Sequence, residues 1–399
     1  MGNKKLNFYF FGDIGTYDKF NPAYACNKEY VPEILYIIAS HKPFSICKFE
    51  IMKELNIEEN KFNNAIDSLK LINAIEDNEK GYKINFPTFL EKDVISMDKH
   101  LNNIGEVVGD KIISLKNVLY EKLSCLTNYK AFTNERLLYH IICDEIFDGT
   151  AFDFFESKEV FCTSKLQQDN RDYIIIVAYE DSSTVEKHSD KLLCSSNNYR
   201  AGDFIFNSFG DSNGARKDVY RFFRLVQKGI ENSSPFYDLN LSYIKVIDDV
   251  NKDIAKRCGE LIYDVYNNSI NYDELTNQDK NLLNFLNEVN YITVNDEDKS
   301  ISTNIPIFQS NDKCIINEIS DIVLLSIFPI VKEIFENFET NVPDLTGVIH
   351  KVDIKEITNE LWHQIFGSAN EYLVKKSFVQ QPEDLNGQGR YLRSLYIDK

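Results

Sequence analysis

Residues 62–89 read FNNAIDSLKLINAIEDNEKGYKINFPTF, and residues 279–308 read DKNLLNFLNEVNYITVNDEDKSISTNIPIF. Three apolar positions of the first stretch recur 217 positions later, namely Leu69, Ile72 and Ile75 as Leu286, Val289 and Ile292. A proline and a phenylalanine recur 219 positions later, namely Pro87 and Phe89 as Pro306 and Phe308. Two extra residues therefore fall in the turn of the second stretch. Self-similarity at a fixed spacing is the signature of a repeated structural unit.

The spacing of 219 positions persists downstream of the turn. The further matches are Ile146-Phe147 with Ile365-Phe366, Val160 with Val379, and Arg171 with Arg390. Chance matching of apolar residues is the alternative in a chain rich in Ile, Leu and Phe. One insertion confined to a turn, with the spacing kept afterwards, favours an internal duplication with copies near 30–180 and 247–399. Residues 8–13, FYFFGD, also resemble residues 206–211, FNSFGD, which suggests a lead-in strand for each copy.

Within the first copy, apolar residues recur at helical spacing over 31–41, 49–55 and 62–72. A short extended piece is expected at 44–46. Alternating residues then flank Asn78-Glu79-Lys80-Gly81, which predicts a β-hairpin. Residues 250–308 repeat this order, with a brief middle helix beginning at Asp273 and a hairpin around 296–299.

Three helices, a short strand and a hairpin resemble the winged helix-turn-helix superfamily. The resemblance is one of fold, covers about 60 residues in each copy, and identifies no particular family within the superfamily. It implies a third helix that enters the major groove of DNA and a hairpin, the wing, that touches the phosphate backbone.

The fold class expected is therefore α+β and mostly helical, with an internal duplication. The expected order is a lead-in strand at 1–29, a winged helix at 30–94, helices and a strand at 95–180, a small central β/α segment at 181–246, a second winged helix at 247–310, and a helical region at 311–399. Long helices are predicted at 95–126 and 315–338, and shorter ones at 134–147 and 354–366 that stop near Gly149 and Gly367. Buried strands are predicted at 173–179, 192–194 and 204–206, and a helix at 219–226.

The candidate DNA contacts lie on the outward positions of the first module's third helix and on its wing. They are Asn60, Lys61, Asn63, Asn64, Lys70, Lys80 and Lys83. Asparagine can read adenine edges and lysine can contact phosphate. Residues 30–90 hold 7 basic and 9 acidic residues, so the field of this module is nearly neutral. Residues 250–308 hold 5 basic and 10 acidic residues, which predicts that the second module is a poor DNA binder.

A second candidate site lies in the central segment, where 9 basic residues outnumber 8 acidic ones over 181–246. The expected contacts for an anion or a nucleic acid are Arg200, Arg216, Lys217, Arg221 and Arg224. Arginine suits bidentate contacts with phosphate and carboxylate. The alternative is that these side chains pair with the surplus carboxylates of the flanking copies.

The net charge of −18 argues against a general attraction of the whole surface to nucleic acid or to an anionic membrane. We expect a non-enzymatic DNA-binding protein, similar to a transcription regulator, that uses tandem winged helices. The alternative is a non-catalytic subunit of a larger, DNA-handling or other assembly, in which the winged helices serve docking or dimerisation. The expected partners are accordingly double-stranded DNA, other proteins or a second copy of the chain, and no membrane.

No catalytic signature occurs in a fitting context, and we expect no catalytic residue, metal or cofactor. The weakest hints are the turn Gly12-Asp13-Ile14-Gly15, the acidic pair Glu180-Asp181, and six histidines at positions 41, 100, 140, 188, 350 and 363. None of the eight cysteines forms a C-x-x-C pair. No signal peptide is visible, and the longest apolar run, 322–331, is too short to span a membrane. A cytoplasmic chain with free thiols is therefore expected.

Overall fold

The computed structural model describes residues 4–101, 103–189, 192–211, 241–295, 297–384 and 389–398. Helices and strands alternate along the chain, and helices predominate, so the predicted α+β, mostly helical class is confirmed. The chain divides into two compact units, each assembled from three segments. Unit 1 consists of Met1–Ile112, Phe147–Leu192 and Leu324–Tyr372, and unit 2 of Ile113–Ile146, Leu193–Val323 and Leu373–Lys399.

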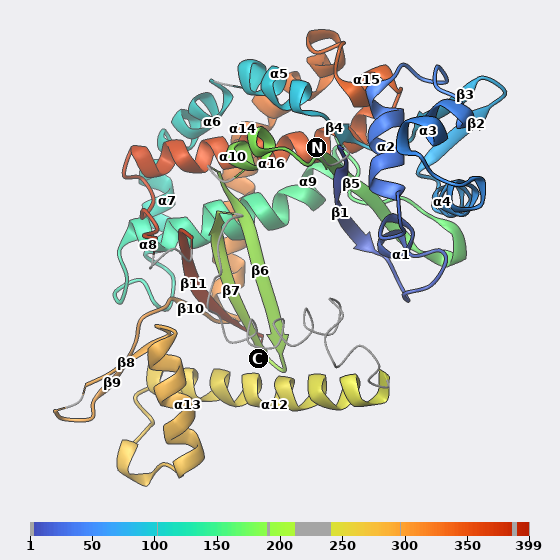
Figure 1. Cartoon of the computed structure of the whole chain (residues 1–399). Helices are drawn as coiled ribbons and strands as arrows, with labels where there is room; N and C mark the ends of the chain where they lie inside the picture. The colour runs from blue at the N-terminus through green and yellow to red at the C-terminus, as the bar shows by residue number, and fades with distance from the viewer. Residues whose placement is uncertain are drawn as a thin grey trace. The chain divides into compact units, whose positions relative to one another are not determined.

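Unit 1 contains the three helices and the hairpin predicted for residues 30–90, which lie together in Figure 1. After the short helix α1 (Pro22–Cys26) come α2 (Val31–Ser40), α3 (Lys48–Leu55), α4 (Glu59–Leu71), β2 (Ile75–Asn78) and β3 (Gly81–Ile84). The predicted strand at 44–46 is wrong, because Phe44 adopts a positive φ of 57° and the segment forms a turn. Phe44 still donates one backbone hydrogen bond of 2.8 Å to the Tyr82 carbonyl in β3.

The periodic apolar residues of these helices form one core. Ile34 and Ile38 of α2, Ile51 of α3, and Phe62 and Leu69 of α4 are all buried in it. The turn of the hairpin approaches this core closely: a Cβ on Gly81 would lie 2.1 Å from the Ile46 carbonyl oxygen. Burial of one apolar face on each helix thus fixes the module, as the helical spacing predicts.

A three-stranded sheet follows in unit 1, with the order β1-β5-β4. Strand β1 (Leu6–Asp13) pairs antiparallel with β5 (Asp172–Glu180), and the short β4 (Thr88–Phe89) pairs parallel with the other edge of β5. The predicted strands at 8–13 and 173–179 are therefore confirmed.

Helices complete unit 1. They include α5 (Glu91–Leu101), α6 (Ile104–Ile113), α9 (Ala151–Ser157), α10 (Ser183–Ser189), α15 (Thr346–Ile349) and most of α16 (Ile354–Lys375), together with the single 3-10 turn η2 (Gln168–Asn170). The long helical stretch predicted over 95–126 is divided into three helices, because a third helix, α7 (Lys116–Leu123), follows α5 and α6.

Unit 2 contains the second helix-and-hairpin set. It consists of α12 (Leu241–Tyr266), the 3-10 turn η3 (Tyr272–Glu274), α13 (Asn277–Glu288), β8 (Ile292–Val294) and β9 (Ile301–Thr303). The middle helix is thus reduced to one turn. Leu261 and Ile262 of α12 share a core with Leu283 and Leu286 of α13.

A four-stranded sheet also belongs to unit 2, and its strands lie side by side in Figure 1. Its order is β10 (Ile307–Phe308), β11 (Tyr391–Ile397), β7 (Phe204–Asp211) and β6 (Leu193–Ala201). Strand β10 pairs parallel with β11, whereas β11 with β7 and β7 with β6 are antiparallel. Strands were predicted within β6 and β7, although shorter than observed.

The remaining helices are α7, α8 (Asn134–Leu138), the π-helix η1 (Tyr139–Thr150) and α14 (Asp312–Asn341). By length and apolar composition alone, α14 is the one helix among the described residues that meets the requirements for crossing a membrane, and core helices of soluble proteins meet them too. It is longer than the helix predicted over 315–338.

The predicted helix stops at Gly149 and Gly367 are wrong. Gly149 lies within the helical run that continues through α9, and Gly367 lies inside α16. Phe147 and Phe155 lie on the two sides of Gly149, and both pack on Trp362, which precedes Gly367 in α16. Phe155 lies 4.9 Å from Trp362 between ring centroids, and Trp362 lies 5.4 Å from Phe147 and donates a 2.8 Å hydrogen bond to its carbonyl oxygen.

We expect Phe155→Ala to lower the free energy of unfolding by about 3–5 kcal/mol, because it opens a cavity among fully buried aromatic rings. Phe49→Ala is the matched control, since Phe49 is 71% exposed, and it should change stability by less than about 0.5 kcal/mol. Urea unfolding measures both values. Equal effects for the two substitutions would contradict the aromatic core.

Candidate functional site

Helix α4 and the hairpin β2–β3 carry all seven predicted DNA contacts of the first module. Phe62, Ala65, Ile66 and Leu69 bury one face of α4, so the opposite face is directed outward. The helix ends at Leu71, and Asn73 then takes the left-handed conformation (φ 54°) that turns the chain into β2.

The outward row of α4 is polar and open to solvent. Asn60, Asn64 and Asp67 are exposed and follow one another at helical spacings of four and three. Asn63 is half-buried, and its amide oxygen accepts a hydrogen bond of 2.8 Å from the Lys48 ammonium. The row therefore offers two amides for base contacts, together with one carboxylate that would repel phosphate.

Three of the four predicted lysines already have carboxylate partners. Lys61 pairs with Glu29 at 3.0 Å and Lys70 with Asp77 at 2.6 Å. Lys83 pairs with Glu76 at 3.2 Å across the two strands of the wing. The hydrogen bond from Lys61 lowers the pKa of the Glu29 carboxyl, so this pair is charged at neutral pH.

Lys80 differs from these three. It lies at the exposed turn of the wing, where its backbone N–H donates a 2.8 Å hydrogen bond to the Asn78 side chain, and no ion pair to its ammonium is found within the described part of the chain. Exposed ion pairs contribute little, about 0–1 kcal/mol, so phosphates can replace the carboxylates at small cost. The carboxylates would nevertheless remain close to the phosphates.

The predicted central basic cluster is only partly described. Arg200 lies in β6, is largely exposed, and pairs with Asp398 at 2.9 Å. Asp398 also pairs with Lys313. Arg200 thus has the carboxylate partner that the alternative interpretation assigned to it. Arg216, Lys217, Arg221 and Arg224, like the predicted helix at 219–226, lie outside the described residues.

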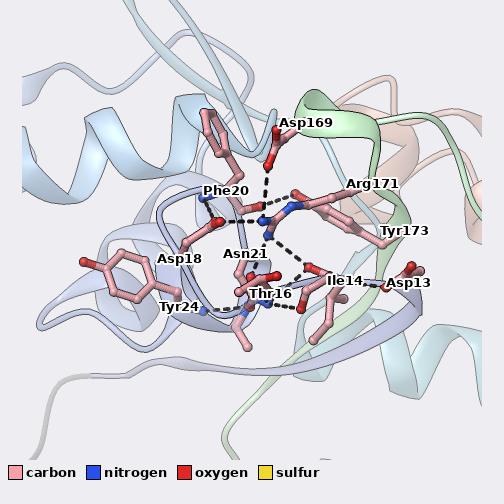
Figure 2. Close-up of polar contacts among 12 residues, drawn as sticks. Asp13, Ile14, Thr16, Asp18, Phe20, Asn21, Tyr24, Asp169, Arg171 and Tyr173 are labelled. Atoms are coloured by element: carbon pink, nitrogen blue, oxygen red, sulfur yellow. Dashed lines mark hydrogen bonds and ion pairs between the residues drawn. The ribbon is translucent and has the colours of Figure 1, made fainter. Parts of the chain in front are cut away.

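The Gly12-Asp13-Ile14-Gly15 turn surrounds a guanidinium (Figure 2). Arg171 is buried and donates hydrogen bonds to the carbonyl oxygens of Ile14 (3.1 Å) and Thr16 (2.9 Å). It also pairs with Asp18 at 2.6 Å. Carbonyl oxygens converge here, and the Gly15 N–H is taken by Asp13 at 2.8 Å. The turn therefore holds a cation of the protein's own chain rather than a phosphate.

Asn21 closes the same turn from the other side (Figure 2). Its side-chain N–H groups donate to the carbonyl oxygens of Ile14, Gly15 and Thr16, and its amide oxygen caps α1 by accepting from the backbone N–H groups of residues 23 and 24. Gly15 has a φ of +63°, which an L side chain rarely adopts. In the sequence, Arg171 was indicated only by its match with Arg390. The Arg390 guanidinium also pairs with a carboxylate, that of Asp211, at 3.3 Å.

We expect Arg171→Met to lower the free energy of unfolding by about 3 kcal/mol or more, since it removes a buried guanidinium together with its hydrogen bonds to Ile14 and Thr16 and its ion pair with Asp18. Arg200→Met removes the same side chain from an exposed pair and should cost less than about 1 kcal/mol. Chemical denaturation of both variants tests this, and a small loss for Arg171→Met would refute the locking role.

Two of the six histidines, His140 and His350, are buried. His140 is fully buried, and burial lowers its pKa well below the usual range. His350 is buried and accepts a 3.1 Å hydrogen bond at Nδ1 from the Ile84 backbone N–H. Its Nε2 lies 3.0 Å from the His41 carbonyl oxygen and therefore carries the proton, which makes the ring neutral.

Burial lowers the pKa of His350 to about 4, against about 6.5 in an unfolded chain. Its contribution to stability is therefore fully present above pH 6.5 and is lost as the pH falls toward 4. We expect the wild-type chain to lose about 3 kcal/mol more between pH 7 and pH 4 than His350→Gln does. His100→Gln, at an exposed position, should keep the wild-type dependence; urea unfolding at both pH values measures the difference, and parallel curves for all three proteins would argue against it.

The acidic pair after β5 is also structural. Glu180 is buried. Its carboxylate accepts hydrogen bonds from the Lys4 ammonium at 2.7 Å and from the Glu91 backbone N–H at 2.9 Å. No group of three or more potential metal ligands occurs among the described residues, and the eight cysteines are thiols that form no disulfide. The contacts of Glu180 therefore provide no evidence for a catalytic or metal centre at this strand end.

No family model, curated protein or solved structure is significantly similar to this chain.

Proposed function

We propose that the chain is an internally duplicated protein with two winged helix-turn-helix modules, and that the first module binds double-stranded DNA through α4 and the wing. A role in transcription regulation and a cytoplasmic location are part of this proposal. It includes no catalytic step, metal or cofactor.

The duplication is supported by matching hydrogen bonds around the two wings. Ala74 N–H donates to the Leu69 carbonyl at 2.9 Å, and its counterpart Tyr291 donates to Leu286 at 2.9 Å. Asn85 N–H donates to Ala74, and Asn304 donates to Tyr291, at 3.0 and 2.9 Å. The first residues of each wing are 217 positions apart and the last are 219 apart, which confines the insertion to the wing.

The two sheets support the duplication in the same way. Strands β4, β5 and β1 are arranged like β10, β11 and β7: one parallel pair followed by one antiparallel pair. Phe89 of β4 pairs with Tyr179, and Phe308 of β10 pairs with Tyr396. Gly12 pairs with Tyr173 in β5, and Gly210 pairs with Tyr391 in β11.

The observation that carries DNA binding is the exposed polar row on α4 beside the wing lysine Lys80. A winged helix of this order presents its third helix to the major groove, and Asn60 and Asn64 occupy the positions that would face bases. The lysine pairs Lys61–Glu29, Lys70–Asp77 and Lys83–Glu76 keep the field nearly neutral. Few phosphates would be neutralised, so binding should be weak and only modestly dependent on salt.

A second candidate function is docking to a protein within a larger assembly, and the second module favours it. Asn281, Asn284 and Asn287 are exposed on α13, but Glu297 and Asp298 at the tip of its wing would repel phosphates. A protein partner with basic side chains suits this surface better than a nucleic acid does.

Fluorescence anisotropy with random and AT-rich duplexes at low salt tests DNA binding. We expect a Kd of about 1–100 μM at low salt, and an affinity that falls modestly as salt rises. Asn60→Ala with Asn64→Ala should weaken binding by about tenfold or more, because each asparagine contact to a base is worth about 1–3 kcal/mol. The matched control is Asn277→Ala with Asn281→Ala in the second module, which should leave the affinity unchanged.

Removing the carboxylates that pair with the lysines should change DNA affinity in the opposite direction. Glu29→Gln with Asp77→Asn should strengthen DNA binding and steepen its salt dependence, since Lys61 and Lys70 become available for phosphates. Glu54→Gln with Asp321→Asn makes the same change in net charge at exposed positions elsewhere. Flat anisotropy for every protein would overturn the DNA proposal and leave protein docking as the function to pursue.

A further inference from the structure

We infer that the N-terminal half (residues 1–189) and the C-terminal half (residues 193–399) exchange helical segments, so that each unit is completed by the other half. The inference rests on the duplication proposed above, and it is independent of DNA binding. Its basis is the composition of the units: unit 1 takes Leu324–Tyr372 from the C-terminal half, and unit 2 takes Ile113–Ile146 from the N-terminal half.

A buried carboxylate fastens the exchanged segment in unit 1. Asp93 lies at the start of α5 and is 2% exposed. One of its oxygens accepts from the Leu90 backbone N–H of its own half at 2.7 Å. The other accepts from the Thr346 backbone N–H of the C-terminal half at 3.1 Å.

The counterpart in unit 2 runs in the opposite direction between the halves. Asp312 begins α14 and is fully buried. It accepts from the Gln309 backbone N–H of its own half at 2.9 Å, and from the Thr127 backbone N–H of the N-terminal half at 2.9 Å. All three members are 219 positions from their partners in unit 1, with Leu90, Asp93 and Thr127 matching Gln309, Asp312 and Thr346.

Two main-chain contacts repeat the same reciprocal relation. Cys162 N–H donates to the Lys355 carbonyl in unit 1 at 3.1 Å, and Gln380 N–H donates to the Glu135 carbonyl in unit 2 at 2.9 Å. Each bond joins a segment of one half to the exchanged helix of the other. The acceptors Lys355 and Glu135 lie in the helices α16 and α8, so each bond requires the main chain of the other half to lie directly against that helix.

Small residues allow the exchanged helix of unit 1 to approach closely. A Cβ on Gly105 of α6 would lie 2.2 Å from the Ser368 hydroxyl oxygen of α16, and one on Gly109 would lie 2.5 Å from the Tyr372 ring. Tyr372 also donates a 2.6 Å hydrogen bond to Asp110. At both glycines the two helices lie so close together that no side chain would fit between them.

In unit 2 the exchanged segment meets the central sheet. The Tyr139 hydroxyl donates to the Phe209 carbonyl at 3.0 Å, and the Asn207 amide donates to Asp144 at 2.6 Å. Arg136, which is buried, donates to the Arg393 carbonyl at 3.0 Å. Separation of the halves would therefore expose apolar surface and break hydrogen bonds of buried groups in both units at once.

Cleavage of the folded chain between the halves tests this inference. A protease recognition sequence is inserted between Ser189 and Leu193 of the full-length protein, and the native protein is cut. We expect the two pieces to remain together on gel filtration at about 1 μM, which requires a Kd well below that concentration. They should separate only when urea unfolds both. Pieces that separate while each stays folded would overturn the exchange.

The buried carboxylates provide the specific variants. Asp93→Ala with Asp312→Ala should weaken the association of the cut pieces by about 100-fold or more, because backbone N–H groups on both sides lose their acceptor. Asp67→Ala with Asp321→Ala is the matched control at exposed positions in the same halves and should leave the association unchanged. Equal affinities for the two double variants would count against the exchange.

Cross-linking of the uncut chain, without the inserted protease site, tests the exchange independently of any effect of the insertion on folding. Carbodiimide joins an ammonium and a carboxylate that are already in contact, so Lys165 should cross-link to Glu356 and Lys122 to Glu318, pairs that are each 2.5 Å apart. Peptide mapping of the monomer should find both links, and the lack of both would overturn the inference. Flat DNA anisotropy, by contrast, would remove the proposed function and leave this result untouched.

Discussion

Two buried carboxylates, Asp93 and Asp312, set the constraint on which the architecture depends. A carboxylate without water must find hydrogen-bond donors, and each of these finds one backbone N–H in its own half and one in the other. The donors are main-chain groups, so the position of the whole segment, and not merely of one side chain, is fixed. Both helices that begin at these carboxylates, α5 and α14, are thereby tied to a segment distant in sequence.

This arrangement explains why neither unit is a single continuous range of the sequence. A domain read from sequence is a continuous range, whereas each unit here is built from three ranges. The aromatic cluster shows the consequence for the core: Trp362 of the C-terminal half packs on Phe147 and Phe155 of the N-terminal half. Truncation of either half would therefore remove core side chains from both units.

Local patterns predicted the local elements well. The apolar spacing of Phe62, Ile66 and Leu69 gave α4, and the continuous β-branched run at 173–179 gave β5. Sequence patterns gave wrong predictions where contacts between residues distant in sequence determine the structure. Gly149 and Gly367 look like helix ends, but aromatic packing carries the helices past them, and nothing local links Asp93 to Thr346. The lysines proposed to contact DNA were likewise predicted by position alone, whereas the pairing of Lys61 with Glu29, 32 residues away, depends on the tertiary structure.

Under the proposed duplication, the exchange of helical segments also constrains how the two copies can diverge. Positions that join the two halves within each unit must be kept in both proposed copies, and Asp93 and Asp312 are both aspartates that bind a backbone N–H of the other half. Outward positions carry no such requirement. Lys61 and Lys70 of α4 correspond to Gln278 and Asn287 of α13, and the net charge of −2 over residues 30–90 becomes −5 over 250–308. A shared interior with unlike surfaces agrees with the proposed function, in which the first module approaches phosphates and the second suits a basic protein surface.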